Sequence, residues 1–249
     1  MNQPSGNLKA FPVWDSSVRW FHWMNVLAII GLIAVGTVIL YSKDIGVSAE
    51  GKVLLKTVHV YIGYVFCVNL LWRLIMAFAA DNRFTRWSSI LPIGKHFSQR
   101  LGEYINGIKT GHAPAYLGHN PMAQLMVSLL FVVLLIMAIS GIVLAGTDVY
   151  MPPFGAIFAD WVTGGDAERL AQLVPGSKEF VDKELYADMR SFRKPFITTH
   201  YYAFFVLLAA VILHIAAVVM SELREKNGLI SAMFTGRKVF SEKPVDLEK

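Results

Sequence analysis

The chain has few of the groups that stabilise a small secreted fold or bind a cysteine-ligated metal cluster. Cys67 is the single cysteine among 249 residues, so the sequence excludes an internal disulfide and clusters with several cysteine ligands. Charged residues make up only 16% of the chain, below the roughly 25% of an ordinary soluble domain. The scarcity of cysteine and of charged residues therefore argues against a disulfide-rich secreted domain and against an ordinary soluble domain.

Long apolar runs dominate what is present. A run of about 20 apolar residues is needed to cross the hydrocarbon of a bilayer, and four such runs occur. None alternates in the manner of a barrel strand. We therefore predict an all-α membrane protein of one domain, residues 1–249, folded as an up-down four-helix transmembrane bundle. Its expected spans are residues 18–41, 58–79, 122–146 and 199–220, with an outer loop at 147–198 and a cytoplasmic tail at 221–249.

The first run is longer than a typical signal-peptide core and lacks a convincing cleavage site, so we interpret it as a retained anchor. The net charge of +5 does not indicate nucleic-acid binding, because the distribution of basic residues among the loops instead indicates how the chain is oriented in the membrane. The outer loop carries eight acids against six bases, whereas bases are frequent in the 81–121 connection and the tail. The positive-inside rule then places both termini in the cytoplasm. The tail bases are Arg224, Lys226, Arg237, Lys238, Lys243 and Lys249.

The connections between the spans contain weaker helical patterns. Residues 97–108 are expected to form a short helix against the membrane surface. In the outer loop, Asp166 should cap a helix that runs to Leu173, and residues 178–192 should form a second helix. Two interpretations of this loop remain open, namely a surface that binds a partner and an ordered cap over the bundle.

The spans lack acidic residues altogether but contain four histidines. Polar side chains are costly in hydrocarbon and usually functional. His200 and His214 are 14 residues apart, close to four helical turns, so they share one helix face about 21 Å apart. In an up-down bundle His59 lies at the outer depth with His200, and His22 at the inner depth with His214.

Two depth-matched histidine pairs, each drawn from two helices, are what two stacked haems require as axial ligands. A zinc site would need its ligands within a few ångströms of one another, and a proton relay would be expected to include carboxylates. Because a single cysteine cannot attach haem covalently, we predict two haem b groups, with His59 and His200 on the outer iron and His22 and His214 on the inner iron.

Small and basic residues near these histidines have two interpretations each. Gly36, 14 residues after His22, and Gly63, four after His59, leave room for a flat macrocycle, although glycine is also common in helix packing. Arg73 lies 14 residues after His59, where it either binds a propionate or snorkels to the headgroups, with snorkelling slightly favoured. Arg19, beside His22, has the same two interpretations.

The remaining histidines, at positions 96, 112 and 119, are by default solvated loop residues. His119 and Asn120 differ because they directly precede Pro121, at the mouth of the third span near the inner pair. They could hydrogen-bond a quinone carbonyl, and Asn120 is about as well suited to cap the helix.

Three stretches resemble the Ni/Fe-hydrogenase b-type cytochrome subunit family, which is related to formate dehydrogenase cytochrome b subunits. They are Val18-Arg19-Trp20-Phe21-His22-Trp23, Gly118-His119-Asn120-Pro121-Met122-Ala123-Gln124 and Ala232-Met233-Phe234-Thr235-Gly236-Arg237-Lys238. The 14-residue spacing of His200 and His214 is also similar. The resemblance covers nearly the whole chain, but the 147–198 loop contains no motif that names a partner.

The resemblance implies a four-helix, di-haem cytochrome b in the bacterial inner (plasma) membrane. Such a protein carries electrons between a periplasmic partner, either a redox subunit or a c-type cytochrome, and the quinone pool. It is an electron-transfer subunit of an oxidoreductase such as a hydrogenase or dehydrogenase, and any enzymatic step of its own is the reaction with quinone. Two alternatives remain: a stand-alone quinone-linked cytochrome that serves a small periplasmic carrier or an oxygen species, and a haem-free anchor or transporter.

Overall fold

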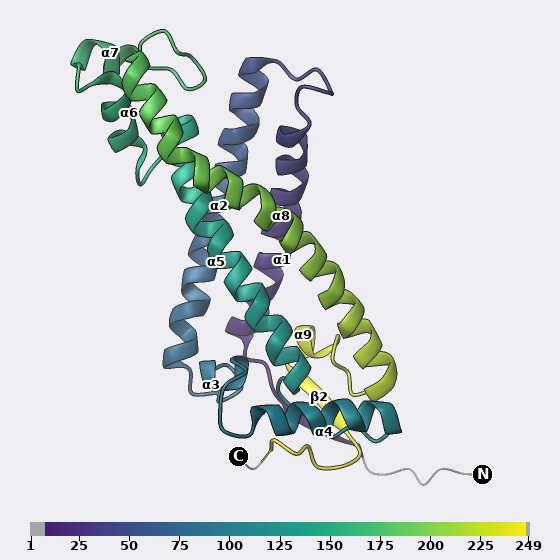
Figure 1. Cartoon of the computed structure of the whole chain (residues 1–249). Coiled ribbons are helices and arrows are strands. Elements are labelled where there is room, and N and C mark those ends of the chain that lie inside the picture. Colours follow the sequence, from purple (N-terminus) through teal and green to yellow (C-terminus); the bar gives the residue numbers. More distant parts are fainter. Residues whose placement is uncertain (1–7, 248–249) are drawn as a thin grey trace. The chain divides into compact units, whose positions relative to one another are not determined.

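The computed structural model describes residues 8–247 and is mostly helical (Figure 1). Lys249, one of the tail bases counted above, lies outside the described residues. Four helices are long and apolar enough to cross a membrane, which confirms the predicted all-α membrane fold. They are α1 (Ser16–Leu40), α2 (Ala49–Ala79), α5 (Pro121–Val149) and α8 (Lys183–Glu225).

Two of these helices begin earlier than their apolar runs. Helix α2 begins at Ala49 instead of residue 58, because Ser48 Oγ accepts a hydrogen bond of 3.0 Å from Gly51 N and so caps a start that is not itself apolar. Helix α8 begins at Lys183 instead of 199 and includes most of the stretch expected as a separate helix at 178–192. Pro195 lies within α8, where it removes one helical hydrogen bond, and the residues on both sides of it remain helical.

The chain forms two compact units, which we describe separately. Unit 1 comprises Met1–Trp23, Leu70–Val132 and Leu207–Lys249, and unit 2 comprises Met24–Asn69 and Val133–Val206. The four membrane helices pass from one unit to the other. The expectation of a single domain stays a prediction.

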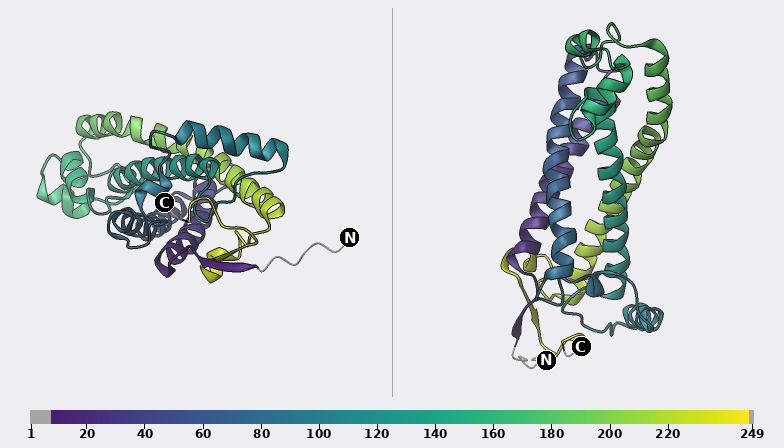
Figure 2. Two further views of the ribbon diagram at one scale, coloured as in Figure 1. Left: turned by 90° about the horizontal axis from the view of Figure 1, so that it is seen from below. Right: turned by 90° about the vertical axis from the view of Figure 1, so that its left-hand side faces the viewer.

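Unit 1 contains a small sheet that the sequence patterns did not indicate. Strand β1 (Lys9–Pro12) pairs antiparallel with β2 (Arg237–Phe240), so that segments from near both ends of the chain lie side by side (Figure 2). The apolar core beneath the sheet includes Trp14, Leu117 and Phe240. Three short helices complete the unit: α3 (Trp87–Ile90), α9 (Ala232–Thr235) and α4 (Phe97–Thr110), the last of which confirms the helix expected at 97–108.

The C-terminal segment also holds the loop that precedes α5. Asp246 accepts hydrogen bonds from the backbone amides of Leu117, at 2.7 Å, and Gly118, at 2.9 Å. Lys238 Nζ donates to the carbonyls of Tyr116 and Gly118, both at 3.3 Å. The backbone immediately before His119 is therefore held by two charged side chains of the tail.

We expect Asp246→Ala to release the Leu117 and Gly118 amides. A hydrogen bond to a charged group contributes roughly 1.5–3 kcal/mol, so the two amides should exchange hydrogen at least about tenfold faster. Hydrogen exchange followed by mass spectrometry on peptides covering 114–120 measures the effect. Glu242→Ala is the control, since Glu242 is an exposed acid of the same tail. Unchanged exchange in Asp246→Ala would show that the carboxylate does not hold this loop.

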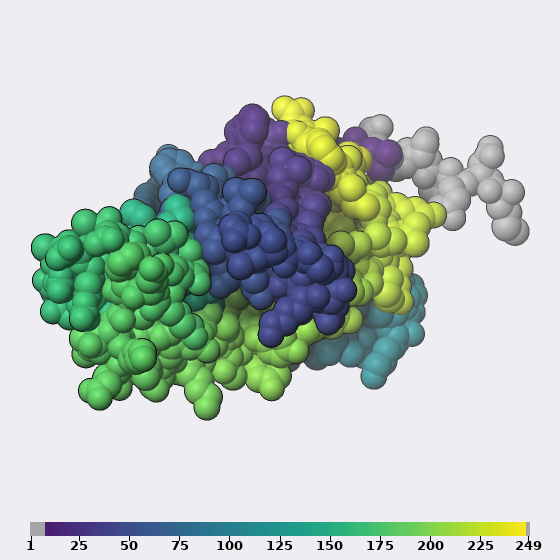
Figure 3. Space-filling model, turned by 90° about the horizontal axis from the view of Figure 1, so that it is seen from above, coloured from purple at the N-terminus to yellow at the C-terminus, as the bar shows by residue number. Residues whose placement is uncertain are grey.

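Unit 2 contains the outer loop, which is largely helical. Asp166 Oδ1 accepts from the amides of Glu168 and Arg169 and caps α7 (Ala167–Gln172), as expected from the sequence. Helix α6 (Gly155–Thr163) was not expected, and it buries Phe158 and Val162 against α5 and α8. Seen from above, the loop (green) lies beside the α1–α2 connection (blue), in agreement with the close approach of Gly176 to Val53 (Figure 3).

Candidate haem sites

The outer histidine pair lies within unit 2. His59 of α2 and His200 of α8 face each other with ring centres 6.4 Å apart and ring planes at 75°. An imidazole nitrogen lies about 2 Å from a metal that it ligates, and the ring centre lies about 1 Å farther away, so two axial rings on one metal have centres about 6 Å apart. The observed separation therefore fits two axial ligands on opposite faces of one flat metal macrocycle.

Ser140 of α5 sets the proton position on His200. The buried Ser140 hydroxyl lies 2.9 Å from His200 Nδ1 and donates its one proton to the carbonyl of Ile136 at 2.6 Å. With its proton on that carbonyl, the hydroxyl accepts from the His200 tautomer that carries its proton on Nδ1 and its lone pair on Nε2. A hydrogen bond of this kind orients a metal-ligating histidine and raises its basicity.

A glycine lies beside each outer imidazole. A methyl group at Gly36 would lie 3.2 Å from His59 Cε1, closer than ordinary contact, whereas one at Gly141 would lie 3.4 Å from His200 Cε1, an ordinary van der Waals contact. A methyl group at Gly63, one turn after His59, would meet no described atom within 4 Å. Gly36 thus gives clearance to the ring of the ligand, whereas the clearance role of Gly63 stays a prediction.

The inner histidines lie within unit 1, so each unit contains one of the predicted pairs. His22 lies on α1 and His214 on α8. The His22 ring packs edge-on against Trp23 with ring centres 5.2 Å apart, and its Nδ1 is buried with no hydrogen-bond partner. In the part of the chain that the structure describes, no group of three or more histidine, cysteine or acidic residues could bind a metal ion.

The family of prokaryotic cytochrome b561 proteins matches residues 13–236, a range that includes all four histidines. The chain belongs to this family. Relatives named "Probable Ni/Fe-hydrogenase B-type cytochrome subunit" include one from Rhizobium leguminosarum bv. viciae, 26% identical over 93% of this chain and 90% of the relative. Another, from Rhodobacter capsulatus, is 25% identical over 94% and 83% of the two chains. A "Probable Ni/Fe-hydrogenase 1 B-type cytochrome subunit" of Escherichia coli (strain K12) is 32% identical over 58% and 64%.

As a member of this family, the protein is a multi-pass membrane cytochrome that binds haem b. The structure offers donors suited to that group, namely the His59 and His200 imidazoles, whose ring centres are 6.4 Å apart and which each have a glycine beside them. Several polar side-chain atoms of unit 1 are also buried without a protein hydrogen-bond partner, and they include His22 Nδ1, Arg73 Nη1 and His119 Nδ1. Unpaired buried polar atoms are rare in proteins, so these atoms are candidates for binding a polar group.

Arg73 of this cytochrome is buried inside unit 1, with 5% of its surface exposed, which contradicts the interpretation that it snorkels to the headgroups. Its Nη2 donates to the carbonyl of Thr85 at 3.0 Å, and the guanidinium lies about 6 Å from the ring centres of Phe21 and Phe131. The connection after α2 folds back over the helix end and encloses the side chain, a tertiary contact that helical spacing does not reveal.

Arg19 is used differently from Arg73. Its guanidinium donates to Ser16 Oγ at 3.0 Å and to the carbonyl of Phe234, so it joins the start of α1 to α9. Two of its nitrogens thus have protein partners. The role of Arg19 toward a propionate stays a prediction.

Of the loop histidines, His96 and His112 are exposed, as expected for solvated residues, whereas His119 packs against Trp14 with ring centres 4.9 Å apart. Burial, followed by the charges of Lys238, Arg73 and His214, lowers the pKa of His119 to about 3. Asn120 Oδ1 accepts from Ala123 N at 2.8 Å and so caps α5, and Asn120 Nδ2 donates to Tyr104 Oη at 2.7 Å. The capping interpretation of Asn120 is therefore confirmed.

We expect acid to destabilise the protein through His119. Between about pH 6.5 and pH 3 the unfolded state binds a proton at His119 and the folded state does not, so the free energy of unfolding falls as the pH falls. Thermal unfolding of the wild type and His119→Gln between pH 7 and 5 measures this. The Tm of the wild type should fall more than that of the variant, with His112→Gln behaving as the wild type. If Tm falls equally with pH in all three proteins, protonation of His119 is not what destabilises the folded state in acid.

Sequence reasoning did not identify Ser140, Gly141 or Lys238. Ser140 and Gly141 form an adjacent small and polar pair in an otherwise apolar span, which was an available signal. Lys238 is buried, and that burial, opposed by the charges of nearby acids, lowers its pKa to about 8. Its place beside His119 depends on the pairing of β1 with β2, which no local pattern indicated.

Proposed function

We propose that this protein is a di-haem b-type cytochrome that carries electrons between an outer-face redox partner and the quinone pool. In this proposal His59 and His200 hold the outer haem, and His22 and His214 hold the inner one. The single observation that carries it is the facing of the His59 and His200 rings at 6.4 Å, with Ser140 leaving His200 Nε2 free to bind iron. The presence of the second pair in unit 1 supports a second haem.

The proposed partner is the catalytic part of a Ni/Fe-hydrogenase. The support is that the relatives are named as Ni/Fe-hydrogenase b-type cytochrome subunits, and the one from Rhizobium leguminosarum bv. viciae aligns with 93% of this chain. The positive-inside distribution of basic residues supports an orientation with both termini in the cytoplasm of a bacterium and the 147–198 loop in the periplasm. The partner, a hydrogenase subunit or a c-type cytochrome, would then reach the outer haem from the periplasmic side.

The haems supply one-electron carriers when bound, and the chain supplies their ligands and surroundings. Ser140 fixes the proton position on His200, and Gly36 and Gly141 make room for the outer rings. In unit 1 the buried Arg73 guanidinium, with Nη1 unpaired, provides a positive charge suited to a propionate of the inner haem. Positive charge near a haem favours its reduced form and so tunes its potential.

The proposed quinone site is at the inner end of unit 1, next to α5. The neutral His119 ring has a buried, unpaired Nδ1, and Trp14 packs against the ring. Asn120 uses both ends of its amide on protein groups, so we assign it to orienting the loop, with its remaining hydrogen-bonding capacity available to quinone. Quinone reduction at this end would take its protons from the cytoplasm.

Counting haem per chain tests the proposal directly. Purified protein should contain two haem b by pyridine haemochrome assay, and a dithionite-reduced minus oxidised spectrum should show both as low-spin, as two imidazole ligands require. A colourless protein from a host well supplied with haem would support the haem-free anchor instead. One haem per chain would leave only one of the two histidine pairs as a haem site.

The quinone assignment predicts a separate phenotype for His119. His119→Phe retains a ring against Trp14 but removes the nitrogens, so quinol-driven haem reduction should slow by about tenfold, as expected for one lost hydrogen bond. The haem content should remain that of the wild type. Stopped-flow absorbance measures the rate, and His112→Phe, at an exposed position, is the control. Equal rates in the wild type and His119→Phe would remove His119 from the quinone site.

A further inference from the structure

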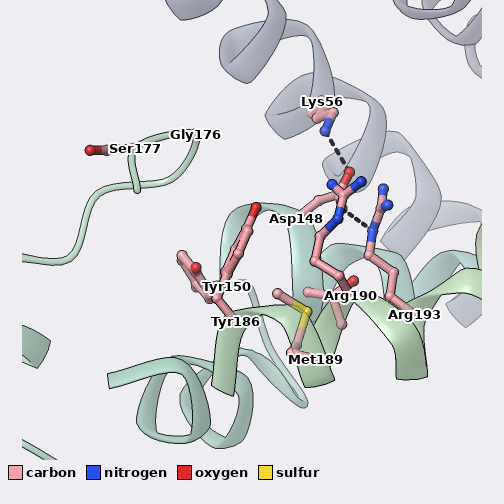
Figure 4. A pocket seen from close by; sticks show the side chains of 10 residues that line it. Lys56, Asp148, Tyr150, Gly176, Ser177, Tyr186, Met189, Arg190 and Arg193 are labelled. Carbon is pink, nitrogen blue, oxygen red and sulfur yellow. Dashed lines mark hydrogen bonds and ion pairs between the residues drawn. The ribbon is translucent and has the colours of Figure 1, made fainter. Parts of the chain in front are cut away.

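A charged pocket of about 100 Å³ lies within unit 2, where α2, α5 and α8 meet the outer loop (Figure 4). Its charged lining residues are Lys56, Asp148, Arg190 and Arg193, and its aromatic lining includes Tyr150 and Tyr186. The histidine arrangement described above does not use these residues. The pocket therefore needs its own explanation.

The pocket contains more positive than negative charge. Asp148 forms ion pairs with Lys56 and with Arg193, each at 2.5 Å, as the dashed lines in Figure 4 show. Arg190 also lines the pocket and has no ion pair among the described residues. Three cations and one carboxylate thus line the pocket, which leaves an excess of two positive charges. Arg193 is 8% exposed and paired with Asp148, whereas Arg190 is exposed and has no acidic partner there, so the pocket is suited to an anion.

The position of the pocket on the helices relates it to the outer histidine pair. Lys56 precedes His59 by three residues on α2, which is about 4.5 Å along the helix and on the same face. Arg193 precedes His200 by seven residues on α8, which is about two turns, again on the same face. Two cations therefore lie just beyond the two ligands, on the same faces of the same two helices.

We propose that this pocket binds the propionate carboxylates of the outer haem. The inference rests on the proposed function, because it requires a haem between His59 and His200. Two propionates carry two negative charges, which match the two excess positive charges of the pocket. Each propionate is a flexible two-carbon arm on the edge of the macrocycle, so it extends from the ligated iron toward a site one to two turns away.

Each lining residue has a distinct role in this arrangement. Arg193 and Arg190 supply planar guanidinium groups that suit carboxylates, and Lys56 supplies a compact charge. Asp148 holds Lys56 and Arg193 in place between the two ligand-bearing helices. Burial, followed by Tyr186 and Asp148, raises the pKa of Tyr150 to about 12, so its hydroxyl remains protonated and able to donate.

The redox potential of the outer haem tests the proposal. Removal of a cation beside a propionate stabilises the ferric haem, so Arg193→Gln, Arg190→Gln and Lys56→Gln should each lower the potential. For Arg193→Gln we expect at least a tenfold shift toward the oxidised form at fixed potential, which is about 59 mV for a one-electron couple. Arg193→Lys keeps the positive charge, so its outer-haem potential should lie between those of the wild type and Arg193→Gln. Lys52→Gln is the matched control, because Lys52 lies one turn before Lys56 on α2 and does not line the pocket.

Haem b dimethyl ester, in which both propionates are esterified, provides the second arm. Wild-type apoprotein should bind haem b at least tenfold more tightly than the ester at the outer site. Arg193→Gln and Arg190→Gln should reduce this preference. Each removes a guanidinium group that binds the carboxylates of haem b but not the esters, so only the affinity for haem b should fall. If Arg193→Gln fails to fold, the more exposed Arg190 and the half-buried Lys56 provide the same comparison.

The outcomes separate this inference from the proposed function. If the outer haem is retained and neither its potential nor its preference over the ester changes in any of the three variants, the pocket does not bind propionates. If added phosphate or acetate lowers the potential of the wild type loaded with haem b as much as that of the ester-loaded wild type, the pocket binds free anions instead of propionates and the inference is overturned. If the wild type has no haem dependent on His200, the proposed function fails first.

Discussion

His200→Ala is expected to lower the haem content from two per chain to one by removing the outer haem. His200 faces His59 with ring centres 6.4 Å apart, so the variant leaves the outer iron a single protein ligand. His214→Ala should remove the inner haem instead, and the double variant should be colourless. Pyridine haemochrome assay of purified protein, together with redox titration, measures both the number and the identity of the remaining haem.

The control for this pair of variants is Ser140→Ala. It removes the hydrogen bond to His200 Nδ1 but no iron ligand, so both haems should remain while the affinity for the outer haem falls by about 10- to 100-fold. A different result would be decisive. If His200→Ala and His214→Ala each retained two low-spin haems, neither histidine would be an axial ligand, and the pairing proposed for the two units would be wrong.

Larger side chains at Gly36 are expected to remove the outer haem without affecting the inner one. A methyl group at this position would already lie 3.2 Å from His59 Cε1, tighter than ordinary van der Waals contact. Gly36→Ala should therefore weaken retention of the outer haem modestly, and Gly36→Leu should displace the His59 ring and abolish binding. Overpacking of a well-packed site typically costs about 1–3 kcal/mol, equivalent to roughly 5- to 100-fold in affinity.

The matched control for the Gly36 series is on the same helix. A methyl group at Gly31 would lie 3.4 Å from the flexible end of the Ile62 side chain, an ordinary contact that does not involve a ligand. Gly31→Ala should therefore retain both haems with unchanged potentials. Full retention of the outer haem in Gly36→Leu, by haem count and redox titration, would show that His59 does not need the position at which the structure places it.

The contrast between Arg73 and the outer pocket shows how charge is used in this cytochrome. Arg73 is a buried cation in unit 1 with one nitrogen bonded to the carbonyl of Thr85 and another unpaired. Lys56 and Arg193 of unit 2 instead share Asp148. In both units a guanidinium lies close to a histidine-bearing helix face, where its positive charge would raise the potential of a neighbouring haem.

Much of the fold could be predicted from the sequence, because the properties that define a membrane helix are local. Hydrophobic length predicted four spans, and the 14-residue interval between His200 and His214 placed them on one face of one helix. Helices α2 and α8 begin before the apolar runs that start at residues 58 and 199, since helices continue past an apolar run wherever capping and backbone hydrogen bonds allow it. Apolar length marks where a bilayer is crossed, and it does not mark where a helix begins.

The details of the sites could not be predicted, because they depend on contacts between distant segments. Helical spacing left two interpretations of Arg73, and the structure excludes one of them by enclosing the side chain under the connection after α2. The sequence singled out His119 by its place before Pro121, but it did not indicate that Trp14, a distant residue near the start of the chain, packs against it. The contact of Ser140 with His200 joins residues 60 positions apart.

By itself, therefore, the sequence determined the class of protein, the number of spans and the four histidines that qualify as ligands, since these follow from hydropathy and helical periodicity along single segments. Only the tertiary structure decided which rings face each other, which nitrogen of His200 is free, and which cations are buried. The physical reason is that periodicity specifies the face of a helix on which a residue lies, whereas hydrogen bonds, ion pairs and burial are set by the residues of other segments that pack against that face.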